Sequence, residues 1–218
     1  MKRGNVWLLL LAFVFMVSAS AALASIEDVQ WWTRTPSIEN VRSDENHRVE
    51  RITGGIRMWV READNFRWDR WGWNVEDPSG IGANNWQIRI TFERLDSGGS
   101  GVLFGRPVRD RNRHLIAAVV GDETLTLVEY GNDGTRGTRN VLKEAPLNSE
   151  HRNLKDVVLT LTFERDSRTV RCIIGDTEYI NENLSRRIPL VEYFGFVCEA
   201  LAGKPSTAAF KKMERRWM

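Results

Sequence analysis

Residues 86–93 read Trp-Gln-Ile-Arg-Ile-Thr-Phe-Glu, with apolar and polar side chains alternating along the stretch. Successive side chains of a β-strand point to opposite faces of a sheet, so this alternation predicts a strand with one buried face. The apolar set that defines that face is Trp86, Ile88, Ile90 and Phe92. The stretch therefore predicts a half-buried β-strand.

The same period of two recurs further along the chain. Its apolar positions are Val157, Leu159, Leu161 and Phe163, then Val170, Cys172 and Ile174, and then Phe194, Phe196 and Cys198. Shorter strands are expected at 101–104, 115–120 and 124–130, and turn residues at 96–99, 131–134, 166–167 and 175–176 separate the runs. Many short strands without a long amphipathic helix predict an all-β protein, either a sandwich of two antiparallel sheets, which we favour, or a barrel.

The N-terminus has the features of a secretory signal peptide. Lys2 and Arg3 precede an uncharged apolar run at 6–17, and Ala22-Leu23-Ala24 provides a cleavage pattern of small residues. The run is short for a membrane span, although an uncleaved N-terminal anchor is the alternative. We expect a signal peptide at 1–24, an N-terminal extension or first strand region at 25–53, and one sandwich domain at 54–218. The mature protein is then secreted, periplasmic or extracellular, with no membrane span.

The charge balance argues against nucleic acid as a partner. The chain has 31 Lys and Arg against 29 Asp and Glu, and cleavage removes Lys2 and Arg3, which leaves a formally neutral protein. Proteins that follow a phosphate backbone carry a basic surface, and the arginines here are scattered.

Cys172 and Cys198 are the two cysteines of the chain. An oxidising compartment permits one disulfide between them, and two buried, unlinked thiols are the alternative. Both share strand parity with large apolar residues, so both are expected in the core. No Cys-x-x-Cys spacing suggests zinc or redox chemistry.

Tryptophan is concentrated before residue 87, and the densest part is 66–73. Trp68, Trp71 and Trp73 are candidate ligand-binding residues, because flat aromatic rings flanked by polar groups can stack on sugar faces. Packing in the sandwich core is the alternative. Phe66 and Trp68 differ in parity from Trp71 and Trp73, which predicts a bulge or turn near 69–70.

No cofactor is expected. His47, His114 and His151 lack metal-ligand spacing. Asp96, Asn132 and Asp133 could hold calcium, although no specific motif supports this and turn chemistry explains them better.

From about residue 54 onward, the order of features resembles the concanavalin A-like lectin/glucanase superfamily, in particular its laminin-G-like and 3-keto-disaccharide hydrolase-like branches. The stretches that carry the resemblance are 86–93, 101–106 (Gly-Val-Leu-Phe-Gly-Arg), 112–114, 125–134, 157–163, 170–179, 194–196 and 210–213. Two departures are Gly105 before Arg106 and the order Gly175-Asp176. The resemblance implies a jelly-roll sandwich and a glycan or polysaccharide ligand. Arg106, His114 and Tyr130 are further candidate ligand-binding residues.

The glucanases of that superfamily use Glu-x-Asp-x-x-Glu on one strand. Here Glu62-Ala-Asp64 and Glu164-Arg-Asp166 begin such a pattern, but Arg67 and Thr169 stand where the second glutamate belongs. Catalytic residues therefore stay unassigned. The leading hypothesis is a secreted, non-catalytic carbohydrate-binding protein; the alternatives are a glycan-active hydrolase and a structural or adhesive protein with a protein partner.

Overall fold

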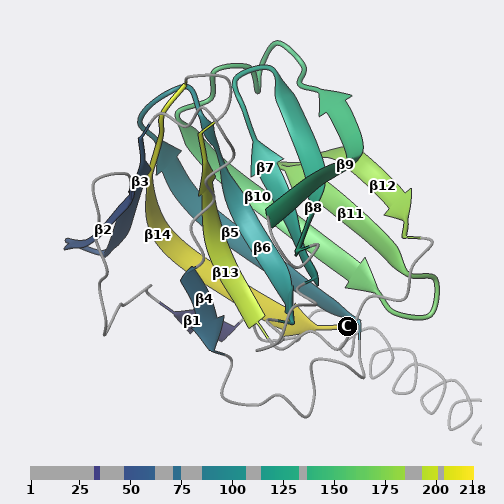
Figure 1. The fold of residues 1–218 in the computed structure, drawn as a ribbon. Helices are drawn as coiled ribbons and strands as arrows, with labels where there is room; N and C mark the ends of the chain where they lie inside the picture. Colours follow the sequence, from purple (N-terminus) through teal and green to yellow (C-terminus); the bar gives the residue numbers. More distant parts are fainter. Residues whose placement is uncertain are drawn as a thin grey trace, which may run out of the picture. The chain divides into compact units, whose positions relative to one another are not determined.

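The computed structural model describes residues 32–34, 47–61, 71–74, 85–106, 114–132, 137–184, 193–200 and 204–218. Contacts divide the chain into residues 1–31 and 32–218, and every described residue belongs to the second unit. All regular structure in the described ranges is β-strand (Figure 1). Within them, no helix has the length and apolar character needed to cross a membrane.

The described strands form two antiparallel sheets, which we call the larger sheet and the smaller sheet. The larger has the order β12-β11-β10-β5-β14-β3-β2, and β1 also pairs with β14; the smaller has the order β4-β13-β6-β7-β8-β9. The strands of the larger sheet are β1 (Trp32–Arg34), β2 (His47–Ile52), β3 (Gly55–Val60), β5 (Trp86–Arg94), β10 (Asp156–Glu164), β11 (Thr169–Ile174), β12 (Thr177–Asn183) and β14 (Ser206–Trp217). Those of the smaller sheet are β4 (Trp71–Asn74), β6 (Gly99–Arg106), β7 (His114–Val120), β8 (Thr124–Asn132), β9 (Gly137–Pro146) and β13 (Tyr193–Glu199).

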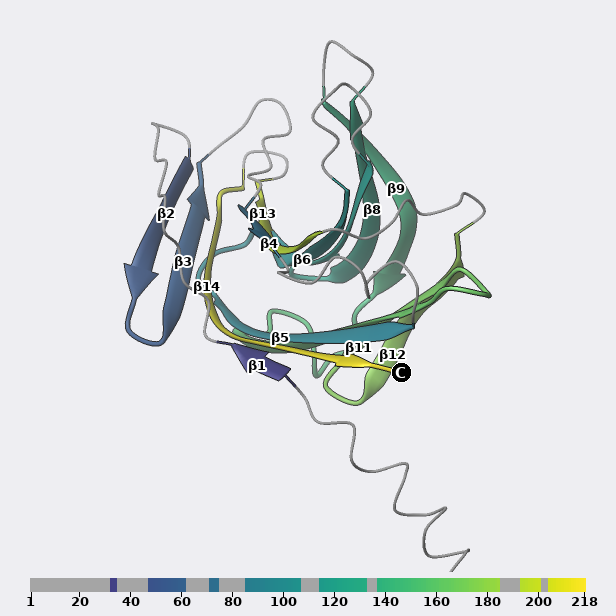
Figure 2. The same cartoon turned by 90° about the horizontal axis from the view of Figure 1, so that it is seen from below.

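The period-two residues form the core between the sheets, as the sequence predicts. In the larger sheet, Leu161 lies opposite Ile88, and Phe163 lies opposite Trp86. The Trp86 ring packs against Phe194 of the smaller sheet, with ring centroids 4.8 Å apart. All the apolar positions of the period-two runs named above are buried in one cluster, among them Ile88, Ile90, Phe92, Leu159, Leu161, Phe163, Phe194 and Phe196. The prediction of an all-β, two-sheet sandwich is confirmed (Figure 2).

Cys172 and Cys198 are both fully buried in this core, as their parity predicts. They are unlinked thiols. Cys172 belongs to β11 of the larger sheet and Cys198 to β13 of the smaller sheet. Of the two alternatives left open by the sequence, the structure has the pair of buried thiols.

The smaller sheet bends strongly, and its outer face is concave (Figure 2). Two glycines allow strand β6 to lie tightly against β7. A Cβ atom added at Gly99 would lie 2.4 Å from Cγ1 of Val119, and one at Gly101 would lie 1.9 Å from the carbonyl oxygen of Ala118. A side chain at Gly101 would therefore collide with the backbone of β7, and one at Gly99 would displace the Val119 side chain.

Candidate ligand-binding site

The concave outer face of the smaller sheet carries an apolar cluster of its own. Leu115, Ala117 and Val119 of β7 belong to it, while the residues between them face the sandwich core. We call the set the outer apolar cluster; its buried members are Leu103, Leu115, Ala117, Val119, Val128, Tyr130 and Val197. The outer face of an antiparallel sheet is ordinarily solvated and polar. A buried apolar patch on this side is therefore unusual.

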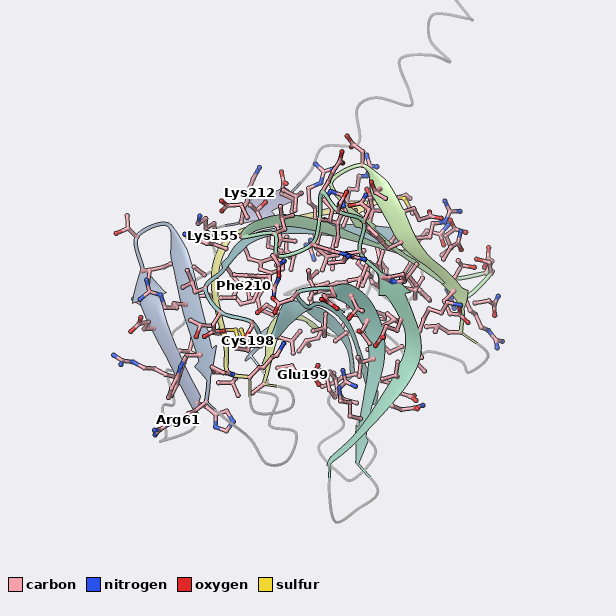
Figure 3. The ribbon with its side chains drawn as sticks, turned by 90° about the horizontal axis from the view of Figure 1, so that it is seen from above. Arg61, Lys155, Cys198, Glu199, Phe210 and Lys212 are labelled. Carbon is pink, nitrogen blue, oxygen red and sulfur yellow. The ribbon has the colours of Figure 1, made fainter. Side chains whose placement is uncertain are left out.

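A buried charged pair lies on the same face. Glu199 follows Val197 at a spacing of two on β13, and it is fully buried. Arg139 of β9 donates from Nε to Oε1 of Glu199, and from Nη2 to Oε2 at 3.1 Å. Figure 3 shows Glu199 within the curve of the smaller sheet, on the side away from Phe210. Two-point pairing holds the carboxylate and the guanidinium in one fixed relative orientation.

Tyr130 completes this polar group. It lies directly opposite Arg139 in the β8–β9 ladder and is fully buried. Burial raises the pKa of the Tyr130 phenol well above its usual range, and the nearby Glu199 carboxylate raises it further. Burial by itself lowers the pKa of Arg139, but the hydrogen bonds to Glu199 outweigh it, and the net shift is upward. At neutral pH the group therefore holds a neutral phenol beside the Arg139–Glu199 salt bridge.

The structure brings three predicted site residues to one end of adjacent strands. Arg106 lies directly opposite His114 in the β6–β7 ladder, and Tyr130 lies opposite Leu115 in the β7–β8 ladder. The register places positions 106 and 114 on the sheet face opposite to that of Leu115 and Tyr130. For Arg106 and His114 the structure describes the backbone alone, and their role as ligand residues stays a prediction.

The predicted tryptophan platform is described only in part. In the β4–β13 ladder, Trp71 lies opposite Phe196 and Trp73 opposite Phe194. Residues directly opposite in an antiparallel ladder share a sheet face, so positions 71 and 73 belong to the face of the core phenylalanines. Trp68 and the expected bulge near residues 69–70 lie outside the described residues.

Asp96, one of the proposed calcium ligands, has a structural partner. Its carboxylate accepts hydrogen bonds from the backbone N–H and from Oγ1 of Thr207, each at 2.7 Å. These bonds tie the turn after β5 to β14. Across the described ranges, no three His, Cys, Asp or Glu side chains gather in a way that could hold a metal ion. The side chains of Asn132 and Asp133 lie outside the description.

The acidic pair Glu164 and Asp166 has the surroundings of ordinary surface charges. Glu164 pairs with Arg171 at 2.8 Å and accepts a hydrogen bond from Ser167 at 3.2 Å. Asp166 is exposed in the turn that follows β10. The other partial motif, at Glu62 and Asp64, lies outside the described residues.

Sequence reasoning missed Arg139 and Glu199. The available signal was Glu199 itself, which is the one charged residue of strand β13. A charge in an otherwise apolar strand requires a partner, because an unpaired buried carboxylate is very costly. That signal points to Glu199 but not to Arg139, because 60 residues separate the two in the sequence.

No protein-family model matches the chain, and no curated protein matches it in sequence. Among solved structures, a seed lectin from Lotus tetragonolobus is similar with a TM-score of 0.52 at 9% identity, over 87% of this chain and 98% of the lectin. The apo Crh5 transglycosylase is similar with a TM-score of 0.50 at 12% identity, over 85% of this chain and 83% of that one. A carbohydrate-binding module, CBM66 from Bacillus subtilis, has a TM-score of 0.49 at 14% identity, over 85% of this chain and 94% of the module. At such identities the likeness concerns architecture alone: the described residues share the two-sheet β-sandwich fold of the seed lectin and the transglycosylase, which agrees with the fold that the resemblance implies.

Proposed function

We propose that this protein is a secreted, non-catalytic carbohydrate-binding protein whose ligand lies on the concave face of the smaller sheet. The observation that carries the proposal is the Arg139–Glu199 pair on this outer face. Removing a charged pair from water is costly, and replacing such a pair by apolar residues is often neutral or stabilising. A pair that is not needed to join the two sheets is therefore a candidate for a functional role.

The geometry suits recognition of hydroxyl groups. An arginine has five N–H donors in a fixed planar arrangement, and Glu199 engages Nε and one N–H of Nη2. The guanidinium is held rigidly while 11% of the Arg139 side chain stays accessible. Ligand sites commonly combine apolar surroundings with a few fixed polar groups, and the outer apolar cluster lies on the same sheet face as Arg139 and Glu199.

The state of Glu199 favours binding over hydrolysis. Glycoside hydrolases that use carboxylates need two of them, one acting as a proton donor. Both oxygens of Glu199 accept hydrogen bonds from the Arg139 guanidinium, which fixes the position of the carboxylate. This supports a positioning role for Glu199 rather than proton transfer.

Further ligand contacts are proposed for the residues singled out in the sequence. Arg106 and His114 lie at the same end of the smaller sheet as Tyr130 and Arg139 but on the opposite sheet face by register, so the contacts proposed for them are at this edge of the sheet. Trp68, Trp71 and Trp73 are the candidates for stacking on a sugar, and for positions 71 and 73 the register of β4 favours packing in the core instead. Export through the signal peptide at 1–24 would bring the protein to extracellular or cell-surface glycans.

The test is a glycan-array screen of residues 25–218, followed by calorimetry on each hit. Arg139→Lys keeps the charge but removes the two-point geometry, and Tyr130→Phe removes only the hydroxyl. We expect each variant to bind at least about tenfold more weakly, with the larger loss for Arg139→Lys.

Arg171→Lys is the matched control, because Arg171 forms an accessible ion pair on the larger sheet. It should bind like the wild type. Unchanged affinity in folded Arg139→Lys and Tyr130→Phe proteins would overturn the proposed site. Product analysis separates the alternatives, since release of shorter sugars from a bound glycan would establish a hydrolase.

A further inference from the structure

A groove with an excess of basic residues lies on the outer face of the larger sheet, on the other side of the sandwich from the proposed site. Its volume is about 840 Å³. We call it the basic groove; its lining residues are Arg51, Ile52, Thr53, Arg57, Glu93, Leu95, Ala209 and Lys211. Figure 3 shows Lys155 and Lys212 on this outer side, whereas Phe210 lies between the sheets.

The floor of the basic groove is Ala209. In the register of the larger sheet, Ala209 of β14 lies between Arg57 of β3 and Glu93 of β5. Neighbouring strands are about 4.8 Å apart, so the two longer side chains stand roughly 10 Å apart on either side of a methyl group. A small residue between two long ones leaves a channel along β14.

A β-bulge directs Lys211 into this channel. On β14, Phe210 lies opposite Phe92 and Lys212 lies opposite Thr91, so Lys211 is the extra residue of a bulge. A bulge changes the direction of a side chain and is often found near functional sites. Here it allows Lys211 and Lys212 to lie consecutively on the outer side while Phe210 stays in the core.

Gly55 makes the close approach of the β2–β3 hairpin to this bulge possible. A Cβ atom at Gly55 would lie 2.0 Å from the carbonyl oxygen of Phe210. The hairpin thereby brings Arg51, Ile52 and Thr53 to the wall of the groove.

Cations outnumber carboxylates in this region. Glu93 pairs with both Lys155 and Lys211, each at 3.1 Å. Glu50 similarly pairs with Arg57 at 2.8 Å and Arg48 at 3.2 Å. Asp156 is a further partner of Lys211 at 3.4 Å.

These pairs affect the ionisation of the groups in the groove. The pKa of Glu93 is lowered, first by its hydrogen bond with Lys155 and then by that with Lys211. Arg51 adds another cation to the lining, so the groove keeps a positive balance although the mature chain is formally neutral.

We propose that the basic groove is a second binding site, for an acidic polysaccharide that carries carboxylate or sulfate groups. Arg57 and Lys211 contact the acidic groups, and the apolar surfaces of Leu95, Ile52 and Ala209 contact the sugar ring. Leu95 is 41% exposed, which leaves it accessible for this contact. The inference goes beyond the proposed function, since it concerns the opposite sheet and a charged ligand.

The experiment uses residues 25–218 and three probes: an oligogalacturonate, a sulfated heparin-derived oligosaccharide, and a neutral malto-oligosaccharide. The test variant is Arg57→Gln/Lys211→Gln. Its matched control is Lys143→Gln/Lys204→Gln, which removes the same charge from residues that are 52% and 58% exposed elsewhere. We expect one or both acidic probes to bind to the wild type. Compared with the wild type, the test variant should bind them at least about tenfold more weakly, and the control variant less than about threefold more weakly.

The two acidic probes distinguish a carboxylate ligand from a sulfate ligand, and binding of either supports the site. Raising the salt concentration should weaken this binding, because the contacts are exposed ion pairs. Equal losses in the test and control variants would show that net charge alone attracts the probe, and would overturn the proposal. Failure of both acidic probes to bind would also overturn it. A loss with Arg139→Lys but not with the groove variant would assign the acidic ligand to the concave face, which contradicts this inference while supporting the proposed function.

Discussion

Arg139 of β9 donates two hydrogen bonds to Glu199 of β13, although β6, β7 and β8 lie between these strands in the smaller sheet. In a flat sheet, four inter-strand spacings would hold the two backbones about 19 Å apart. The contact is possible because the sheet bends around the outer apolar cluster. The ion pair therefore joins two distant parts of the concave face and stabilises its curvature.

Replacing Glu199 by Gln should be strongly destabilising. The change leaves Arg139 largely buried without its anionic partner, and breaking a buried ion pair in this way costs about 3–5 kcal/mol. Equilibrium denaturation with urea at pH 7 measures the free energy of unfolding. The matched control is Glu50→Gln, whose partners Arg57 and Arg48 are exposed, and it should cost no more than about 1 kcal/mol.

A double substitution, Arg139→Met/Glu199→Met, should recover much of the stability lost by Glu199→Gln, because it removes both charges together. It should not recover glycan binding. Similar losses for Glu199→Gln and Glu50→Gln would contradict a stabilising role of the pair.

Tyr130 predicts a loss of stability at high pH. Its pKa in the folded protein is raised well above the ordinary value of 10.0. Above pH 10, the unfolded chain releases the phenol proton while the folded protein retains it, so rising pH favours unfolding. Below pH 10 this contribution does not vary with pH.

The comparison of wild type with Tyr130→Phe isolates this contribution from that of the cysteines. Between pH 10 and 11, the free energy of unfolding should fall more steeply in the wild type, by up to about 1.4 kcal/mol per pH unit for one proton. Ultraviolet absorbance gives a second measurement, because one of the three tyrosines should ionise only on unfolding. Parallel stability curves would contradict the prediction.

The sandwich core was predictable because parity along a strand is a local property. The spacing of Ile88, Ile90 and Phe92 determines one face of β5 whichever strand pairs with it. The Arg139–Glu199 pair was not predictable in the same way, because it depends on strand order and on the bend of the sheet. Likewise, the bulge at Lys211 follows from the pairing of β14 with β5, which the sequence of β14 alone does not reveal.

The two cysteines should be unreactive in the folded protein. Burial raises the pKa of Cys198 to about 12, against the opposing effect of hydrogen bonds with Ser100 and Ser206. Burial also raises the pKa of Cys172. The thiolate is the reactive form, so iodoacetamide at pH 8 should modify neither residue. After denaturation without reductant, mass spectrometry should find both thiols modified. An unmodified, denatured protein would instead show that the two form a disulfide.

The register of β4 gives a definite expectation for the tryptophan-rich segment. Positions 71 and 73 lie opposite Phe196 and Phe194, whose side chains are buried in the core. This pairing favours the core interpretation over the sugar platform for these two positions.

Trp71→Ala and Trp73→Ala should then each lower the free energy of unfolding by about 3–5 kcal/mol, the usual result of emptying a buried aromatic site. Thermal denaturation gives the stability, and calorimetry on the folded variants gives the affinity for any glycan hit. The opposite pattern, with stability within about 0.5 kcal/mol of the wild type and binding abolished, would identify the two rings as the platform instead. Removing a core ring lowers stability, whereas removing an exposed ring leaves stability nearly unchanged. The stability of this pair of variants therefore distinguishes the interpretations even before the ligand of the concave face is known.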